Sequence, residues 1–446
     1  MSVPAVVIAA PSSGSGKTTV ATGLLGALRA GGHTPAPFKV GPDYVDPGYH
    51  ALAAGRPGRN LDPVMVGESL VGPLYAHGSA GCDVAVVEGV MGLFDGRTGS
   101  GGHGSTAHVA ELLGAPVVLV VDTRGQAGSL AALLHGFATY RPRTRLAGVV
   151  LNRVGSQRHE QVLRAACEEV GLPVLGVLPR DDGLTVPSRH LGLVTAVEHG
   201  AAAVTAVAAM TALVCKHVDV DAVRALAAST VTAAAWSPAV AVGPGTLGRE
   251  RRPRVAVAGG AAFTFGYAEH IELLEAAGAE VVTVDPARDA ALPEGTRGLV
   301  LPGGFPEEHV ATLAANTTLL EEIRALARHA PVHAECGGLL YLARELDGHR
   351  LAGVLDATAT FGPRLSLGYR DAVALGDSVL HEAGNRVTGH EFHRTVLTPG
   401  VGAQAAWGWT GTTEGFVQGQ VHASYLHTHP AAAPGSVARF VAACAA

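Results

Sequence analysis

The sequence predicts an α/β protein of two domains, each built on a largely parallel sheet covered by helices. Short continuous apolar runs alternate with helical stretches, as in sheets that are buried on both faces. The 446 residues exceed what one hydrophobic core normally holds. A segment rich in proline, glycine and charge, 237–253, divides the chain. We therefore expect domains at 1–236 and 254–446, joined by a linker at 237–253.

The composition favours a well-buried globular protein and excludes several classes. Apolar residues make up 48% and charged residues 16%, which argues against disorder. The formal net charge is −6 without a basic block, so nucleic acid is not an expected partner. Five widely spaced cysteines predict neither a disulfide framework nor a zinc site, and they fit a reducing cytoplasm. No leader pattern or membrane-spanning run is expected, so a membrane is not an expected partner either.

The first strand and helix, expected at 3–9 and 20–29, enclose a predicted phosphate-binding loop. Glycines in such a loop let backbone N–H groups face phosphate oxygens, and the helix N-terminus adds partial positive charge. Lys17 is expected to reach the β- and γ-phosphates of ATP, and Thr18 to ligate Mg²⁺. Pro11 stands where the full pattern has glycine, so a loop that only resembles this motif is the alternative. The predicted nucleotide-binding residues here are Gly14, Ser15, Gly16, Lys17, Thr18 and Thr19.

Acidic residues follow the next two expected strands, 35–40 and 84–87. Asp43 lies in a turn-rich loop after the first, and Glu88 follows the second directly, with Asp95 in the glycine-bounded loop beyond. Because parallel strands end at one edge of a sheet, these acids are expected beside the phosphate-binding loop. Glu88 is predicted to hold Mg²⁺, directly or through water. Capping carboxylates in solvated turns are the alternative.

The rest of the first domain supplies one further candidate, Asn152. It follows the expected strand 146–151, and its amide is a candidate for reading an adenine edge, with a turn-forming asparagine as the alternative. The alanine-rich segment 197–228 is expected to be helical and to have no chemical role. The other elements expected here are strands at 116–121 and 173–178 and helices at 129–139 and 157–170.

The second domain is organised around Cys336. This residue follows the expected strand 331–334 and precedes Gly337, at a tight strand-to-helix turn. Such a turn exposes a nucleophile, and the helix N-terminus is expected to lower the pKa of the thiol. A buried, inert cysteine is the alternative. The N–H groups of Gly304 and Gly337 form the predicted oxyanion hole. Other elements expected in this domain are strands at 254–258, 280–284 and 298–301 and a helix at 267–277.

A cysteine nucleophile needs a base. Downstream candidates are His390, His393, His422, His427 and His429. His427 follows an expected strand end. Phosphoryl transfer on one domain and a Cys–His pair on the other together favour amidation of a carboxylate. ATP would convert the carboxylate to an acyl phosphate, and glutamine hydrolysis would supply unprotonated ammonia.

Seven segments identify a resemblance to the glutamine-dependent a,c-diamide synthases of cobalamin biosynthesis, which act on cobyrinate or hydrogenobyrinate. The segments are 10–19, 38–47, 88–96, 188–193, 334–338, 389–393 and 424–427. The resemblance implies a dethiobiotin synthetase-like P-loop domain and a class I glutamine amidotransferase-like domain. It implies ATP and Mg²⁺, with L-glutamine and a corrin-type macrocycle as substrates. It also implies Cys336 as glutaminase nucleophile, His427 as its base, and Asp43 and Asp95 in the synthetase site. Pro11 belongs to this family pattern.

The resemblance leaves three points open. Many such amidotransferases have glutamate two places after the histidine, but His429 stands there, so the third member of the constellation is undetermined. Which macrocycle is used is undetermined too, and so is the oligomeric state, with a homodimer as one alternative.

Other functions are less favoured. A cobyric acid synthase shares both domains, but the segment 38–47 and the compact length argue against it. A partition-type ATPase switch usually has an extra lysine early in the loop, which 11–15 lacks, and it would not use Cys336. A non-catalytic module that binds glutamine or a corrinoid is the third alternative.

Overall fold

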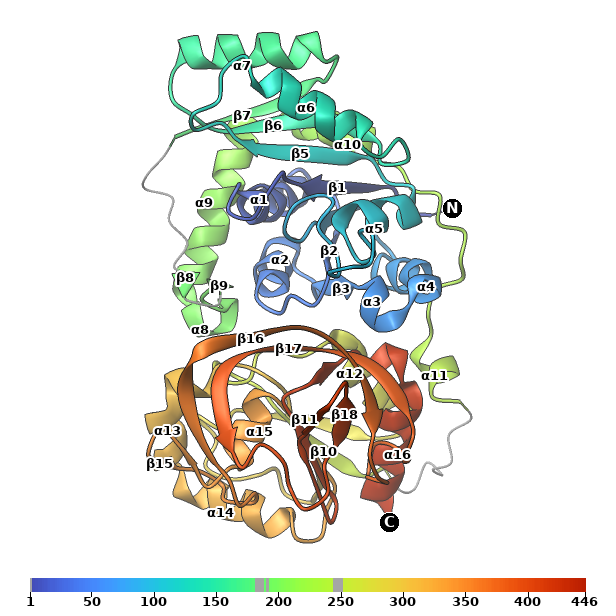
Figure 1. Ribbon diagram of the computed structural model, residues 1–446, viewed down its shortest axis with the longest axis vertical. Coiled ribbons are helices and arrows are strands. Elements are labelled where there is room, and N and C mark those ends of the chain that lie inside the picture. Colours follow the sequence, from blue (N-terminus) through green and yellow to red (C-terminus); the bar gives the residue numbers. More distant parts are fainter. Residues whose placement is uncertain (1, 181–187, 190–191, 244–251) are drawn as a thin grey trace. The chain divides into compact units, whose positions relative to one another are not determined.

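The computed structural model describes residues 2–180, 188–189, 192–243 and 252–446. It divides into two compact units, Met1–Trp236 and Ser237–Ala446 (Figure 1). Each unit has its own sheet and its own hydrophobic core.

The first unit is built on a seven-stranded parallel sheet in the order β3-β2-β4-β1-β5-β6-β7. Its strands are β1 Ala5–Ala9, β2 Pro35–Val40, β3 Arg59–Leu61, β4 Val84–Glu88, β5 Val117–Asp122, β6 Leu146–Val154 and β7 Val174–Pro179. Strand β1 is central and entirely buried, between β4 and β5. Lys39 of β2 is in register with Glu88 of β4, so the sheet itself sets two charged side chains next to each other.

Helices α1 to α7 lie between these strands in the chain, and α8 to α10 follow the last strand. They are α1 Lys17–Ala30, α2 Asp46–Ala54, α3 Pro63–Val66, α4 Glu68–Gly78, α5 Thr106–Leu113, α6 Leu130–Thr139, α7 Gln157–Glu169, α8 Ala196–His199, α9 Ala201–His217 and α10 Val220–Leu226. Helices α1 and α9 lie side by side at close range (Figure 1). A Cβ on Gly26 of α1 would collide with the side chain of Thr211 on α9, so glycine permits this approach.

The strands and helices that the sequence predicted in this unit are present, with differences at their ends. Strand β3 and helices α2 to α5 were not predicted, and α2 begins at Asp46, inside the loop expected after the strand 35–40. Helix α1 begins at Lys17 rather than at 20, which puts the lysine itself in the first turn. Strand β6 extends to Val154 and so includes Asn152. The segment 197–228 falls mainly into α9 and α10. The motif 188–193 is described only as the short strands β8 Ser188–Arg189 and β9 Gly192–Leu193, and residues 190–191 lie outside the described part.

The second unit has a six-stranded sheet in the order β11-β10-β12-β13-β21-β20. Its strands are β10 Arg254–Ala258, β11 Glu280–Val284, β12 Thr296–Leu301, β13 Val332–Glu335, β20 Phe416–Gln418 and β21 Val421–Ser424. All pairs are parallel except β20 with β21. Strand β13 ends at Glu335, so Cys336 begins the turn at the carboxyl edge of the sheet.

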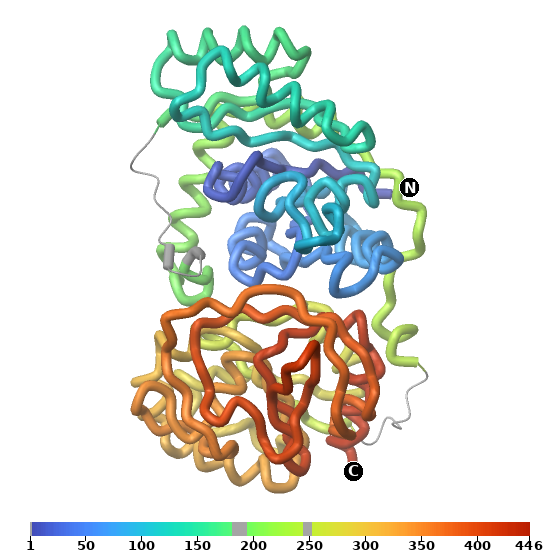
Figure 2. The backbone as a smooth tube through the Cα atoms, viewed as in Figure 1, coloured from blue at the N-terminus to red at the C-terminus, as the bar shows by residue number. Residues whose placement is uncertain are grey.

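A second sheet in this unit was not predicted. Its strands are β14 Glu345–Leu346, β15 His349–Arg350, β16 Thr358–Ala374, β17 Arg386–Thr398, β18 Trp407–Trp409, β19 Thr412–Glu414 and β22 His427–Thr428. The long strands β16 and β17 run antiparallel and curve together (Figure 2). Strand β22 pairs with β17 and sets His427 opposite His390.

The helices of the second unit are α11 Pro238–Ala241, α12 Ala268–Ala276, η1 Pro306–His309, α13 Val310–Ala315, α14 Thr317–Leu326, α15 Gly337–Leu342, η2 Pro430–Ala432 and α16 Pro434–Ala445. The segment expected as a linker thus begins with a short helix, α11, and its residues 244–251 lie outside the described part. Among the described residues, no helix combines the length and the apolar character that crossing a bilayer requires.

Candidate active sites

The turn between β1 and α1 has the backbone of a phosphate-binding loop. Gly14 and Gly16 have φ of 77° and 100°, in the left-handed region that favours glycine. A Cβ added to Gly14 would meet nothing within 4 Å, so the loop encloses open space on that side. Ser15 closes the loop by donating from its hydroxyl to the carbonyl of Ser12 at 3.0 Å. Thr19 follows in the first turn of α1.

Lys17 lies buried at the start of α1. Its Nζ donates to the carbonyl of Met91 at 2.6 Å and to that of Ser12 at 3.2 Å. Burial, and then the nearby ammonium of Lys39, lower the pKa of Lys17 to about 8. The amine is thus held beside the loop by two carbonyl groups, which phosphate oxygens can replace.

Lys39 is the centre of a buried ionic cluster. Its Nζ lies 2.6 Å from Asp46 Oδ2, 3.0 Å from Glu88 Oε1 and 3.7 Å from Asp43 Oδ2. Burial opposes the charge of this lysine, but Asp46 and Glu88 raise its pKa above the usual range. Burial and the neighbouring carboxylates of Asp43 and Glu88 raise the pKa of Asp46. More carboxylates therefore meet here than one ammonium group balances.

Glu88 is bound from three sides at the end of β4. The hydroxyl of Thr18 donates to Oε1 at 2.7 Å, and His50 Nε2 lies 2.6 Å from Oε2. Burial works against the charge of Glu88, but Lys39 and His50 lower the pKa of this carboxyl below its usual range. Thr18 and Glu88, the two residues predicted to hold Mg²⁺, are thus in direct contact, and the carboxyl group of Glu88 is ionised.

Asp43 and Asp95 shape the loops around this cluster. Asp43 Oδ1 accepts hydrogen bonds from the N–H groups of Val45 and Asp46, at the start of α2. Asp95 Oδ2 accepts from the N–H of Gly92 at 2.9 Å. A Cβ on Gly92 would lie 2.6 Å from both Asp95 Oδ2 and the carbonyl of Pro11, so Asp95 borders the phosphate-binding loop. All four predicted acidic or hydroxyl positions gather at one sheet edge.

Asn152 contacts the same loop from β6. Its Nδ2 donates to the carbonyl of Ser15 at 2.9 Å, and its amide fills the space that a Cβ on Gly16 would need. Its amide nitrogen therefore braces the loop, so recognition of adenine would fall to the amide oxygen.

This edge of the sheet fits a nucleotide with Mg²⁺. Hydroxyl and carboxylate oxygens are the ligands that Mg²⁺ takes, and Thr18 and Glu88 supply one of each. The carboxylates of Asp43, Asp46, Glu88 and Asp95 outnumber the ammonium groups of Lys17 and Lys39 by two. A divalent cation would balance that excess.

A second group of possible metal ligands lies away from this edge. Glu68 Oε1 is 3.4 Å from His103 Nδ1 and 3.3 Å from His108 Nε2. However, His108 Nδ1 accepts a hydrogen bond from the N–H of Gly104, so in the neutral ring Nε2 keeps the proton. His108 is then a donor to Glu68 rather than a metal ligand.

In the second unit, Cys336 has the strained backbone of a nucleophile elbow. Its φ of 46° and ψ of −98° are unusual for a residue with a side chain, and they cost of order 1–3 kcal/mol. Its N–H donates to the carbonyl of Ser424 at 2.7 Å, and its Sγ lies 4.0 Å from the carbonyl of Phe392. Neighbouring strands thus fix the turn on both sides.

The predicted oxyanion-hole glycines lie next to each other. A Cβ on Gly337 would lie 2.9 Å from the nitrogen of Gly304, so the two backbones meet where only glycine fits. A Cβ on Gly303 would collide with the ring of His427. The segment Gly303–Gly304 therefore touches His427 on one side and the turn after Cys336 on the other.

The thiol does not behave as the sequence suggested. We expected the helix N-terminus to lower the pKa of Cys336, but burial, and then Glu307, raise it well above the usual value. Helix α15 spans only Gly337–Leu342, and a short helix cannot offset desolvation and nearby carboxylates. Burial likewise lowers the pKa of His427 to about 4. Both groups are neutral at rest.

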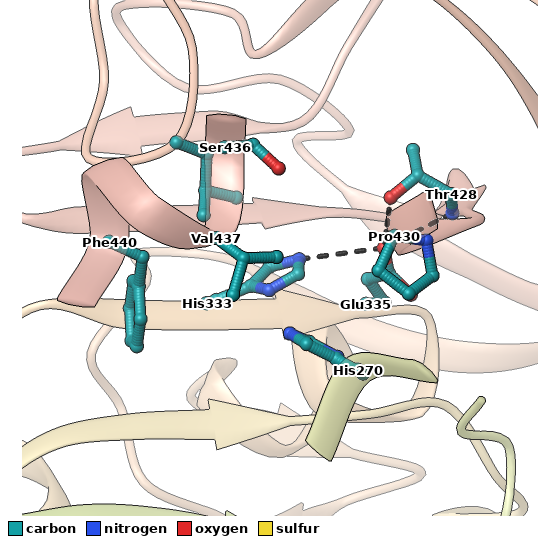
Figure 3. A pocket seen from close by; sticks show the side chains of 9 residues that line it. His270, His333, Glu335, Thr428, Pro430, Ser436, Val437 and Phe440 are labelled. Carbon is teal, nitrogen blue, oxygen red and sulfur yellow. Dashed lines mark hydrogen bonds and ion pairs between the residues drawn. The ribbon is translucent and has the colours of Figure 1, made fainter. Parts of the chain in front are cut away.

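A cavity lies behind the nucleophile strand. It is lined by His270, His333, Glu335, Thr428 and Ser436, among others (Figure 3). His333 Nε2 is 3.4 Å from Glu335 Oε1, and Thr428 donates to the same oxygen. Of the other base candidates, His422 lies inside β21, His429 caps η2, and His390 and His393 lie in β17, where His390 is paired opposite His427.

Sequence reasoning assigned no role to three residues of these sites: the buried Lys39 and His50, and Glu335, which is partly buried. Lys39 is 3% exposed inside an otherwise apolar strand, and a lysine in such a strand could have been recognised from the sequence as a candidate functional residue. His50 and Glu335 gave weaker signals, since each becomes notable only when its partner in space is known. Asp46 was recognised only as a loop acid.

Comparison with known proteins follows the same division. Residues 6–194 match the family of the CobQ/CobB/MinD/ParA nucleotide binding domain. Residues 254–434 match the CobB/CobQ-like glutamine amidotransferase domain.

The chain is also similar to full-length curated proteins. It is 63% identical over 453 residues to hydrogenobyrinate a,c-diamide synthase of Mycobacterium bovis, covering 99% of this chain and 98% of the relative. Identity to the protein of the same name from Streptomyces coelicolor is 58% over 475 residues, with 99% and 98% covered. Identity to cobyrinate a,c-diamide synthase of Gloeobacter violaceus is 43% over 450 residues, with 99% and 97% covered. The chain therefore belongs to the a,c-diamide synthase family, glutamine-dependent ligases that join a nucleotide-binding domain to a glutamine amidotransferase domain.

Proposed function

We propose that the protein amidates the a and c acetate carboxylates of hydrogenobyrinate, using ATP, Mg²⁺ and L-glutamine. The hydrogenobyrinate relatives reach 63% and 58% identity, whereas the cobyrinate relative from Gloeobacter violaceus reaches 43%. Cobyrinate is the second candidate. The observation that supports glutamine as the nitrogen source is the strained turn at Cys336, where the backbone of Gly337 meets Gly304, next to the Gly303 backbone that touches His427.

In the first unit, the P-loop backbone and Lys17 bind the phosphates, and Thr18 and Glu88 hold Mg²⁺. ATP, when bound, supplies the phosphoryl group that makes the substrate carboxylate an acyl phosphate. Lys17 then replaces its bonds to two carbonyls with bonds to phosphate oxygens and offsets their developing charge. Asp43 and Asp95 border the substrate side of this site.

In the second unit, Cys336 attacks the side-chain carbonyl carbon of glutamine. His427 accepts the thiol proton and later donates it to the departing ammonia. The N–H groups of Gly304 and Gly337 bind the oxyanion, and water hydrolyses the thioester to glutamate. Ammonia displaces phosphate from the acyl phosphate and forms the amide.

The test separates the two sites. Cys336→Ala should lose glutamine-driven amidation at least a thousandfold and keep amidation driven by ammonium chloride. Lys17→Ala should lose amidation from both nitrogen sources and keep a slow glutaminase. Cys215→Ala and Lys216→Ala, which change exposed residues of α9, are matched controls that should resemble the unchanged protein. Full amidation by Lys17→Ala would exclude the nucleotide site.

Product analysis decides between the macrocycles. The protein is incubated with ATP, Mg²⁺, glutamine and either hydrogenobyrinate or cobyrinate, and products are identified by mass spectrometry. A product with two added amides from hydrogenobyrinate supports the proposal. More than two amides would indicate cobyric acid synthase activity, and ATP hydrolysis without any amide would indicate a P-loop switch.

Two further expectations complete the proposal. The five cysteines are all free, which accords with a cytoplasmic location. A homodimer is the proposed assembly, and light scattering of the purified chain tests it.

A further inference from the structure

We propose that Glu335, the residue directly before the nucleophile, is the carboxylate that positions His427 and stabilises its charged form. This inference rests on the proposed roles of Cys336 and His427. It assigns the third member of the constellation to the strand that carries the nucleophile, instead of to the position two places after the histidine.

His429, which occupies that usual position, already has another role. Its Nδ1 accepts a hydrogen bond from the N–H of Ala431 and so caps the short helix η2. Its ring packs against Tyr267, with centroids 4.2 Å apart. A histidine used as a cap and a packing surface cannot supply the negative charge that a glutamate would give.

Glu335 is placed to supply that charge. Its Oε2 lies 3.9 Å from His427 Nδ1. Its other oxygen, Oε1, accepts from the N–H and the hydroxyl of Thr428 at 3.1 and 2.8 Å, and lies 3.4 Å from His333 Nε2. With Oε1 fixed by these partners, Oε2 is the oxygen directed to His427 (Figure 3 shows the partners of Oε1).

The strand topology explains how Glu335 and Cys336, which are adjacent in the sequence, reach opposite sides of the His427 ring. Strands β13 and β21 are parallel, and Glu335 is in register with Ser424, so the chain after β21 returns His427 beside β13. Side chains alternate along a strand, so Glu335 shares a face with His333. The left-handed turn at Cys336 then redirects Sγ. The carboxylate of Glu335 lies toward Nδ1 of His427, which leaves Nε2 to accept the proton of the Cys336 thiol.

The electrostatics agree with this arrangement. Burial opposes its charge, yet His333, His427 and Thr428 lower the pKa of Glu335 to about 2, so it is ionised at neutral pH. Glu335 acts to raise the pKa of His427, against the larger effect of burial. His393 and Glu391 also face His427, from β17, with opposite effects. Of the groups named here, Glu335 is the one that contacts Nδ1 within ion-pair distance.

The step it assists is a single proton transfer. The thiol proton of Cys336 passes to Nε2 of His427 while the sulfur lone pair forms the bond to the substrate carbon. The imidazolium that results has a proton on each nitrogen, and Nδ1–H faces the charge on Oε2. Glu335 takes no proton. Catalytic hydrogen bonds are often long before substrate binds, and a closure of about 1 Å would make this contact one.

The test compares Glu335→Gln with Glu414→Gln. Glu414 is a buried glutamate of the same unit, bonded to Ser424 and Tyr425 and outside the proposed constellation. Two quantities are measured on the full chain. One is the rate of amidation with glutamine as nitrogen source, compared with the rate with ammonia. The other is the alkylation rate of Cys336 by iodoacetamide from about pH 7 to about pH 11.5, a range that reaches above the usual thiol pKa, followed by peptide mass spectrometry.

We expect Glu335→Gln to lower the glutamine-driven rate about 100-fold or more and to leave the ammonia-driven rate within twofold. The alkylation midpoint should move to lower pH by about one unit, because the charge of Glu335 opposes formation of a thiolate at Cys336 while His427 is neutral. Glu414→Gln should leave that midpoint in place. Glu335→Asp, which keeps the charge, should restore the midpoint even where the rate recovers only in part.

Two results would overturn the proposal. One is an unchanged alkylation midpoint in Glu335→Gln. The other is an equal loss of rate in Thr428→Val, which removes a hydrogen bond to Oε1 and no charge, since Glu335 would then only hold β22 in place. If Glu335→Gln does not fold, the midpoint of Glu335→Asp against that of Thr428→Val decides. If the unchanged protein hydrolyses no glutamine, the proposed function fails, but the alkylation midpoint still tests the coupling.

Discussion

The two sites use charge in opposite ways. At the edge of the first sheet, Lys39 meets Asp46 and Glu88 at 2.6 and 3.0 Å, and the Lys39 ammonium and the Glu88 carboxylate are ionised and paired before any ligand arrives. At the edge of the second sheet, Cys336 and His427 are buried and neutral, and the charge nearby is that of Glu335. One site is charged at rest, and the other acquires charge during the reaction.

This difference follows from what each site must bind. A site for a polyanion and a divalent cation needs fixed charges of both signs, because ions replace one another there at little cost in reorganisation. A site for the neutral amide of glutamine has no such need, and a thiolate kept in a buried position would be costly. The comparison can be tested by removing a charge from the first site and by imposing charge on the second.

The largest effect should come from removing the central cation of the first site. Lys39→Met leaves the carboxylates of Asp43, Asp46 and Glu88 facing one another without their ammonium partner. Breaking a buried pair in this way costs roughly 3–5 kcal/mol. In a unit of this size that corresponds to a fall in melting temperature of roughly 6–20 °C, measured by calorimetry. Amidation from either nitrogen source should also be lost.

Mg²⁺ makes this prediction specific. Millimolar Mg²⁺ should restore much of the lost stability in Lys39→Met, because the cation replaces the missing positive charge among the same carboxylates. Lys216→Met, at an exposed position on α9, is the matched control and should change neither stability nor its dependence on Mg²⁺. If Lys39→Met in the absence of Mg²⁺ were as stable as the unchanged protein, this would contradict a first site that is charged before ligands bind.

A somewhat smaller effect should follow from acidifying the second unit. Burial lowers the pKa of His270, His381 and His427 to about 4. Between pH 6.5 and 4 the unfolded chain therefore binds protons that the folded unit does not, so stability falls as the pH falls through this window. The loss is of order 1 kcal/mol or more for each histidine at pH 5.

Glu414 opposes this trend. Burial raises the pKa of its carboxyl to about 7, so its protonation stabilises the fold as the pH falls below that value. The histidines outnumber it, so the net change is a loss. Hydrogen exchange at pH 7.5 and pH 5, resolved by peptide, should show protection decreasing in β13 and β21 before it decreases in β1 and β4. Equal loss in both sheets would mean that the histidines are not held neutral by burial.

The same contrast between the two sites explains which features could be predicted from the sequence and which could not. For the first site, the sequence indicated the phosphate-binding loop and the acids Asp43, Glu88 and Asp95, because these follow parallel strands and such strands end at one edge. It did not indicate Lys39 and His50, which pair with these acids. Gly14, Lys17, Thr18 and Glu88 needed no knowledge of distant contacts. The first sheet, the six-stranded sheet and the elbow at Cys336 were likewise accessible from apolar runs and glycines.

The second site depends on contacts that the sequence does not display. Strands β16 and β17 were missed because Gly362, Pro363 and Gly368 interrupt the pattern, and the pairing has an irregularity between Phe361 and Ser366. The raised pKa of Cys336 reflects burial beneath these strands, which local sequence cannot show. Glu335 was passed over because its role requires knowing that β22 returns beside β13.

The smallest effect should come from changing His50, which contacts Glu88, the carboxylate predicted to hold Mg²⁺. Its Nε2 lies 2.6 Å from Glu88 Oε2, while the hydroxyl of Thr18 contacts Oε1, so the histidine orients the carboxylate without facing the nucleotide loop itself. His50→Gln keeps a donor of shorter reach and should weaken the apparent affinity for Mg²⁺ about tenfold. Ammonia-driven amidation at saturating Mg²⁺ should change less than threefold, since Glu88 remains. Titrating that rate with Mg²⁺ measures both quantities. A lowered rate at saturating Mg²⁺ with unchanged affinity would instead place His50 in the reaction itself.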